Sequence, residues 1–425
     1  MKRCTTVAGR LSLILLLGVT ITGAATPTIS VPHDAAIEFY KNKLKIDPKD
    51  FLSAISLGDV YAAKARLTGA VTDYRKAENA FRRSLAIMPT YNMDAKIGLA
   101  AVLTSQHRFK EADAIIKEAL SESPNTPMLW ALAGDIAFDF GDYDRADGFY
   151  KLFAKTKPGL ESWSRQAKVA MLNGSWLSAE RLWKRICALS PGSDPEPSAW
   201  AWVMQGELYL SLGKFKEAMS CYDQSLELLA NFRLALEHKA EINFIEKNFG
   251  EGISLLEKAI AAGSHDPELW ILLGDAFEKA GQHDSAVVAW QKGEVSYRRL
   301  LKDGNVAYLR PLALFYLNHK KNVDEARKLA QRDLTIREDY GGYLTLARAY
   351  LQLGRKKEAL NVIQKSNPKA ENDPQFCFHA GEIFLANGNI SEALRLFTQA
   401  SRICPAFDQI YGTDLATKLS ELSRL

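Results

Sequence analysis

The sequence predicts an all-α fold, an αα-hairpin superhelix, and three observations support this class. A small residue recurs about every 34 residues and is followed four positions later by a large apolar residue in most units. A second small residue stands about twelve positions before most of these markers, and a glycine often lies between the two. Proline stands twelve positions after six markers, where a helix must stop because proline lacks the backbone donor.

The markers define eleven units whose spacing varies between 33 and 41 residues. They are Ala36, Ala77, Ala112, Ala146, Ala179, Ala218, Gly252, Ala286, Ala326, Ala359 and Ala393. A small residue on each helix lets two backbones approach, and the bulky residues fill the grooves between hairpins. One hairpin cannot bury its apolar face alone, so such units stack into a superhelix.

This spacing and these residue types resemble the tetratricopeptide repeat family, whose period is 34. The resemblance covers about residues 34 to 407, and it is weakest around Gly252 and between Ala326 and Ala330. It implies a solenoid in which the first helix of each hairpin lines a concave groove that binds partner peptides.

Domain boundaries follow from breaks in the pattern. The segment Ser190–Ser198 holds three prolines and predicts a hinge between sub-arrays 34–190 and 199–407. Residues 34–48 hold only the second half of a hairpin, and residues 408–425 carry Leu415, Leu419 and Leu422 at helical spacing. Both ends are therefore expected to act as caps, the second as a capping helix.

The N-terminus predicts an export signal over residues 1–25. A basic leader precedes the apolar run Leu11–Thr22, and Gly23, Ala24 and Ala25 fit a cleavage site. The run is short for a membrane span of about 20 residues, which favours cleavage over an uncleaved anchor. We therefore expect a periplasmic or secreted protein, with an inner-membrane anchor facing the periplasm as the alternative.

The composition points away from nucleic acid and from catalysis. The net charge is +4, and three of the positive charges lie in the leader, so the remainder is close to neutral. The seven histidines are scattered, and the sequence has no zinc-protease helix, phosphate-binding glycine loop or glycine-flanked nucleophilic serine. We expect no enzyme, no cofactor and no metal site.

Two local clusters leave alternatives open. Asp139, Asp142, Asp144 and Asp147 surround one inter-helix turn without the ligand spacing of a calcium loop, so we expect a solvated turn. Cys377 opens the first helix of the last unit and Cys404 ends its second helix, so the two are neighbours in a hairpin. They form either a disulfide or a pair of buried free thiols.

The resemblance also predicts a protein-binding row in the groove. In the family, the residue after the small residue of each first helix tends to face inward, and six of the ten such residues here are acidic. An apolar row lies one helical turn further on. The candidate binding residues from both rows are Asp135, Phe138, Glu207, Leu210, Glu241, Phe244 and Asp275. An acidic row beside an apolar row suits a basic or amphipathic segment.

The sequence departs from the family's acidic-tail binders at two positions, and it allows more than one function. Asp135 and Glu207 stand where relatives that bind acidic tails carry asparagine, so acidic tails are not expected partners. The leading hypothesis is an exported scaffold for protein–protein interactions in an envelope or secretion complex. The alternatives are an inner-membrane-anchored organiser of enzymes and a glycan-binding accessory protein that uses Trp200 and Phe138.

Overall fold

A computed structural model describes residues 33–189, 195–319 and 322–424, and every regular element in these residues is helical. The first half holds α1 (His33–Ile46), α2 (Phe51–Thr68), α3 (Val71–Ile87), α4 (Met93–Ser105), α5 (Phe109–Glu122), α6 (Pro127–Phe140), α7 (Tyr143–Thr156), α8 (Leu160–Leu172), α9 (Trp176–Cys187), α10 (Glu196–Ser211) and α11 (Phe215–Leu228). The second half holds α12 (Arg233–Ile245), α13 (Phe249–Ala261), α14 (Pro267–Lys279), α15 (His283–Lys302), η1 (Val306–Tyr308), α16 (Leu309–Asn318), α17 (Val323–Leu334), α18 (Tyr340–Gln352), α19 (Lys356–Ile363), η2 (Pro368–Asn372), α20 (Pro374–Ala386), α21 (Ile390–Ile403), α22 (Phe407–Tyr411) and α23 (Leu415–Leu422).

Two sequence predictions concern residues outside these ranges. The predicted leader, residues 1–25, and residues 190–194 of the predicted hinge are not among the described residues. None of the helices in the described ranges is long and apolar enough to cross a membrane.

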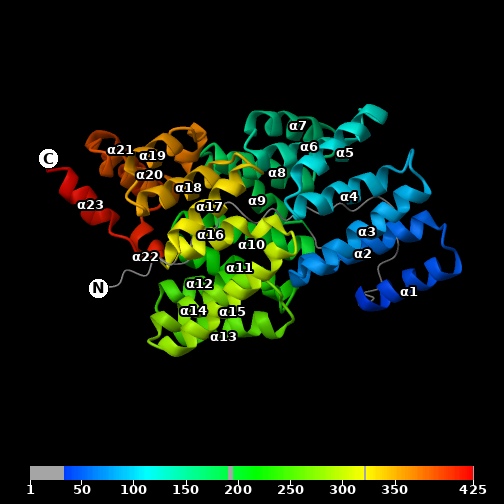
Figure 1. The fold of residues 1–425 in the computed structure, drawn as a ribbon, viewed down its shortest axis with the longest axis horizontal. Helices are drawn as coiled ribbons and strands as arrows, with labels where there is room; N and C mark the ends of the chain where they lie inside the picture. The colour runs from blue at the N-terminus through cyan, green and yellow to red at the C-terminus, as the bar shows by residue number, and fades with distance from the viewer. Residues whose placement is uncertain (1–32, 190–194, 320–321, 425) are drawn as a thin grey trace.

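Consecutive helices pack into hairpins from α2 and α3 to α20 and α21, which confirms the predicted αα-hairpin superhelix (Figure 1). The small residue of a first helix lies against the bulky residue of its partner. A Cβ added to Gly206 would come within 2.3 Å of the Tyr222 ring, and one on Gly134 within 2.5 Å of the Tyr150 ring. The small residues are therefore required for these close contacts.

The units with the weakest sequence pattern are also helical hairpins. In the α12–α13 hairpin the positions of the small and bulky residues are reversed. Gly252 of the second helix packs against the Phe244 ring of the first helix. Two of the three wide marker spacings coincide with long helices, α2 with 18 residues and α15 with 20. The superhelix thus absorbs extra residues by lengthening single helices.

The superhelix is wound so tightly that successive turns touch. The His265 backbone N–H donates to the Thr68 carbonyl at 2.8 Å, and the Asn372 side-chain amide donates to the Leu172 carbonyl at 2.9 Å. Arg75 donates to the Asp303 carbonyl at 2.6 Å. These partners are about 200 residues apart in sequence, so α14–η2 lie alongside α2–α9 (Figure 1).

A buried cluster of charges orders the part of the second turn that meets the first turn. Arg310, 1% exposed, donates to Asp333 at 2.8 Å and to Asp339 at 2.6 Å, which ties α16 to α17 and to the start of α18. The loop before α18 then meets Gly141, whose φ of +86° disfavours other residues and whose added Cβ would lie 2.8 Å from the Glu338 carbonyl. Glycine is thus required at position 141 both by the backbone conformation of the inter-helix turn and by the close approach of the loop before α18.

The first and last helices lie at opposite ends of the molecule and differ in surface (Figure 1). α23 buries Leu415 and Leu422 and exposes mainly polar side chains, as expected of a capping helix. α1 buries Ile37 and Leu44 but leaves the outward-facing Phe39 and Ile46 exposed. Within residues 33–424, a polar outer face is therefore present on α23 and not on α1.

Candidate functional site

The predicted acidic row lies on the inner helices, but its members already bind basic side chains of the same chain. Asp135 of α6 is 3% exposed and accepts hydrogen bonds from Arg165 of α8 at 2.9 and 2.6 Å. It also accepts one from the Tyr150 hydroxyl at 2.8 Å. Asp135 therefore joins one first helix to the next.

Glu207 of α10 and Glu241 of α12 share one histidine. His238 Nδ1 lies 3.0 Å from a Glu241 carboxylate oxygen, and Nε2 forms an ion pair with Glu207 at 2.8 Å. Burial disfavours a charged imidazole, but the carboxylates of Glu241 and Glu207 outweigh it and raise the pKa of His238 to about 9. The imidazolium holds both acids at neutral pH.

Asp275 of α14 also lies beside a histidine, and it lines a cavity. One of its oxygens accepts from the Trp290 indole at 2.9 Å and lies 2.7 Å from His319 Nε2, just after α16. Asp135 and Glu207 thus pair with a basic side chain of the next first helix, and Asp275 pairs with the residue that follows the next first helix. The sequence carried a signal for two of these partners, because Arg165 and His238 both stand two residues before the small residue of their helix.

The apolar row is distributed between core and groove. Leu210 and Phe244 are buried at 9% and 3% exposure and belong to the core. Phe138 is half-buried, with the Lys168 ammonium 4.3 Å from its ring centroid. Trp200, named for the glycan-binding alternative, packs edge-on against Trp183 at 5.7 Å.

The prediction of a solvated acidic turn is wrong for Asp139. Its carboxylate is 3% exposed, and neither oxygen has a hydrogen-bond partner among the described residues. Burial raises the pKa of Asp139 to about 8, although Lys168 acts in the opposite direction. The sequence could not reveal this, because the loop before α18, from the next superhelical turn, lies against this turn. The described residues hold no group of three His, Cys, Asp or Glu side chains placed to bind a metal.

Cys377 and Cys404 are both buried free thiols in the structure. The Cys377 thiol donates to the Glu371 carbonyl at 3.2 Å. Burial raises the pKa of both thiols, that of Cys404 to about 12.

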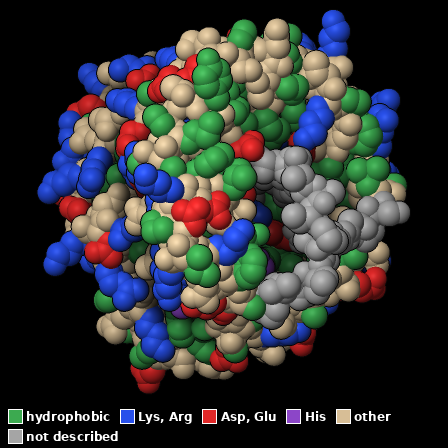
Figure 2. Space-filling view, turned by 90° about the vertical axis from the view of Figure 1, so that its right-hand side faces the viewer, with side chains coloured by type: hydrophobic (Ala, Val, Ile, Leu, Met, Phe, Trp, Pro, Cys, Tyr) green, Lys and Arg blue, Asp and Glu red, His purple; other side chains and the backbone are tan. Residues whose placement is uncertain are grey.

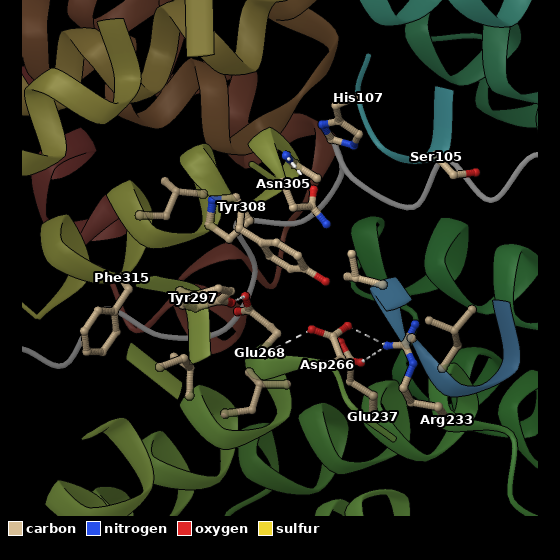
Figure 3. A pocket seen from close by; sticks show the side chains of 18 of the residues that line it. Ser105, His107, Arg233, Glu237, Asp266, Glu268, Tyr297, Asn305, Tyr308 and Phe315 are labelled. Carbon is tan, nitrogen blue, oxygen red and sulfur yellow. Dashed lines mark hydrogen bonds and ion pairs between the residues drawn. The ribbon is translucent and has the colours of Figure 1, made fainter. Parts of the chain in front are cut away.

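A cavity of about 230 Å³ opens where the ends of α2 and α4 meet α12, α14 and α16. Its walls come from both superhelical turns, so no single repeat forms it. Four carboxylates line it, together with two guanidinium groups. They belong to Glu237, Asp266, Glu268, Asp275, Arg66 and Arg233. Figure 3 labels Glu237, Asp266, Glu268 and Arg233 among them.

The charged groups of the cavity are organised by side chains around it. Arg233 donates to Glu237 at 3.0 Å and to Asp266 at 3.1 Å, while its buried Nε has no partner among the residues that the structure describes (Figure 3). The Tyr297 hydroxyl donates to Glu268. His107 stays neutral, since burial and then Arg337 and Arg310 lower its pKa.

Aromatic rings complete the walls of the cavity. Tyr74, Tyr308 and Phe315 line it from α3, η1 and α16. Burial raises the pKa of Tyr308, so its hydroxyl stays protonated and can donate or accept. A cavity with excess carboxylates beside aromatic rings has the chemistry to accept a cationic group.

The fold and this inner surface define a helical-repeat protein of the kind that binds other proteins. Three family models, all described as tetratricopeptide repeat, match residues 70–136, 201–231 and 254–403. Together they cover more than half of the chain, which belongs to the tetratricopeptide repeat family. Solenoids of this family are typically non-catalytic scaffolds for protein–protein interactions.

Several solved structures are partly similar to this chain. Yeast Tom70 is 14% identical over 92% of both chains, with a TM-score of 0.42. The human IFIT1 dimer with PPP-AAAA is 15% identical over 87% of this chain and 78% of its own, with a TM-score of 0.47. A tetratricopeptide repeat protein from Parabacteroides merdae is 17% identical over 62% of this chain and 98% of its own, with a TM-score of 0.38. No curated protein matches the sequence.

Proposed function

We propose that this protein is an exported scaffold that binds a basic segment of another protein, within an assembly of the bacterial envelope or a secretion complex. The cavity between the superhelical turns carries the proposal. It holds four carboxylates against two guanidinium groups, and aromatic rings line it, among them those of Tyr74, Tyr308 and Phe315. A lysine or arginine side chain would meet both opposite charge and ring faces there.

The other acids of the predicted row contribute less to this binding. Asp135 is engaged by Arg165, and Glu207 and Glu241 by His238. An incoming cation would have to displace these buried partners and leave them unpaired, which is strongly unfavourable. The proposed contact therefore falls on the cavity, where Asp275 of the row is joined by Glu237, Asp266 and Glu268.

The binding proposal is tested by fluorescence anisotropy with labelled hexalysine and hexaglutamate peptides. We expect hexalysine to bind, with affinity that falls as salt rises, and hexaglutamate not to bind. Glu268→Gln should weaken hexalysine binding about tenfold, a loss of about 1.4 kcal/mol. The control is Glu227→Gln, which changes an exposed acid outside the cavity. Equal binding of both peptides, or equal affinity of Glu268→Gln and wild type, would contradict the proposal.

Export is tested separately, by mass spectrometry of the protein recovered from fractionated cells. We expect a mature N-terminus near Thr26 in the periplasmic or secreted fraction. An intact leader in the membrane fraction would favour the anchored organiser instead. Capture of envelope proteins by the wild type but not by Glu268→Gln would then link location to binding.

A further inference from the structure

The outward face of α1 is an apolar stripe at one end of the molecule. Ala35, Phe39, Asn42 and Ile46 follow at spacings of four, three and four residues, so they lie along one side of the helix. The side chains that α1 buries, Ile37 and Leu44, belong to the opposite side. Phe39 is 59% exposed and Ile46 is 85% exposed. No described residue therefore covers this stripe.

A stripe of this kind is unexpected at the end of a repeat array. Terminal repeats usually present a polar outer face, because nothing stacks on them. α23 follows this rule at the other end, where Ser420 and Glu421 are exposed. Figure 2 views the molecule from the end at which α1 lies, and apolar side chains are exposed there among Lys and Arg side chains.

We propose that α1 is a dimerisation helix, which pairs in antiparallel orientation with α1 of a second copy of this chain. The spacing of the stripe alternates three and four residues, which is the spacing of a coiled-coil seam. Asn42 lies in the middle of the stripe, and a polar residue in a seam lowers the stability of the pair. This interface is separate from the cavity and does not depend on it.

The size and charge of the side chains favour a second copy in antiparallel orientation. The two-fold axis places Ala35 opposite Ile46 of the second copy, so a small residue meets a large one. Glu38 and Lys45 lie on the same flank of the stripe, and each then faces the other residue of the second copy. In the single chain, Glu38 binds Lys41 and Lys45 binds Asn42. These contacts are exposed, so little is lost when they are exchanged.

The interface is small, and the dimer should therefore be weak. α1 has 14 residues, whereas stable interfaces bury about 1,200–2,000 Å² in total. We expect a monomer–dimer equilibrium with a dissociation constant in the micromolar range, roughly 1–100 μM.

Sedimentation velocity of the full chain, as isolated from the cells that make it, tests the proposal between about 1 and 100 μM. The wild type should shift from monomer to dimer with concentration, and Phe39→Glu with Ile46→Glu should stay monomeric. Leu177→Glu is the matched control, because Leu177 of α9 is 62% exposed away from α1, and this variant should still dimerise. Circular dichroism of each variant confirms that the helices are retained.

Charge reversal tests the pairing itself. Glu38→Lys alone should abolish the dimer, and Glu38→Lys combined with Lys45→Glu should restore it. A wild type that stays monomeric at 100 μM would overturn the proposal. So would a dimer that survives the Phe39→Glu and Ile46→Glu changes, since another surface would then hold it.

Cysteine cross-linking tests the orientation. In an antiparallel pair, Ala35→Cys mixed with Ile46→Cys should form a disulfide-linked dimer on oxidation. Ala35→Cys alone should not, because two copies of position 35 lie about 16 Å apart along the axis, at 1.5 Å per residue. Cross-linking of Ala35→Cys with itself would show a parallel pair and overturn the proposed orientation.

Discussion

His238→Gln is expected to destabilise the protein strongly near pH 6 and much less at pH 9.5. The imidazole is 2% exposed and lies between Glu207 at 2.8 Å and Glu241 at 3.0 Å. Glutamine has a similar size and can still donate hydrogen bonds, but it carries no positive charge. The substitution therefore removes the charge that holds the two carboxylates, with little change in packing.

The size of the effect follows from the pKa of His238. The pKa rises from an ordinary 6.5 to about 9 on folding, and each unit corresponds to about 1.4 kcal/mol, so the charge contributes about 3 kcal/mol. The folded pKa is raised, so this contribution is fully present below pH 6.5 and is lost as the pH rises through 9. The difference in unfolding free energy between wild type and variant should shrink over that interval.

Urea unfolding and amide hydrogen exchange at pH 6, 7.5 and 9.5 measure this difference. Hydrogen exchange in α12 is needed because repeat arrays can unfold in parts. His283→Gln is the control, since that side chain is 72% exposed and pairs with Glu278 at the surface. Its effect should stay below about 0.5 kcal/mol. An equal loss of unfolding free energy for His238→Gln at pH 6 and pH 9.5 would refute the idea that the His238 charge holds Glu207 and Glu241.

Three further predictions follow from packing, burial and thiol chemistry. Gly206→Ala should lower the unfolding free energy by about 1–3 kcal/mol, since its Cβ would lie 2.3 Å from an aromatic ring. Gly148→Ala, which meets nothing within 4 Å in α7, should raise it by about 0.5–1 kcal/mol in the same urea titration, and equal effects would contradict the packing argument. Burial raises the pKa of Asp139 to about 8, so between pH 4 and pH 8 the folded protein keeps a proton on Asp139 that the unfolded chain loses. The unfolding free energy of the wild type should therefore fall as the pH rises over that interval. Asp139→Asn should remove that decline in melting temperature, and an unchanged decline would place its cause elsewhere. Cys377 and Cys404 should both react with maleimide after denaturation without reductant, whereas failure of both to react would show the disulfide.

The hairpins could be predicted from the sequence because their causes are local. The Gly134–Tyr150 contact joins residues 16 apart, and the same contact recurs at Gly206 and Tyr222. A small residue and a bulky one must keep this spacing wherever two helices of one hairpin meet. The fold class was therefore visible in a single sequence.

The candidate site could be predicted only in part. The sequence placed Asp275 on an inner helix, but the cavity it lines also takes Tyr74 from the other superhelical turn. It also placed Asp135 and Glu207 on inner helices without showing that Arg165 and His238 would engage them. Those partners come from the next repeat, where both stand two residues before the small residue of their helix, but that position alone does not show that they reach the acids.

The sequence by itself determined the helical hairpin, its repeat and the residues that must be small. Tertiary structure decided how tightly the hairpins wind, because the pitch sums small rotations over about six repeats before Thr68 meets His265. The packing of one turn against the next buries Asp139 and forms the cavity. A rotation too small to alter any one hairpin thus decides which surfaces this protein offers to its partners.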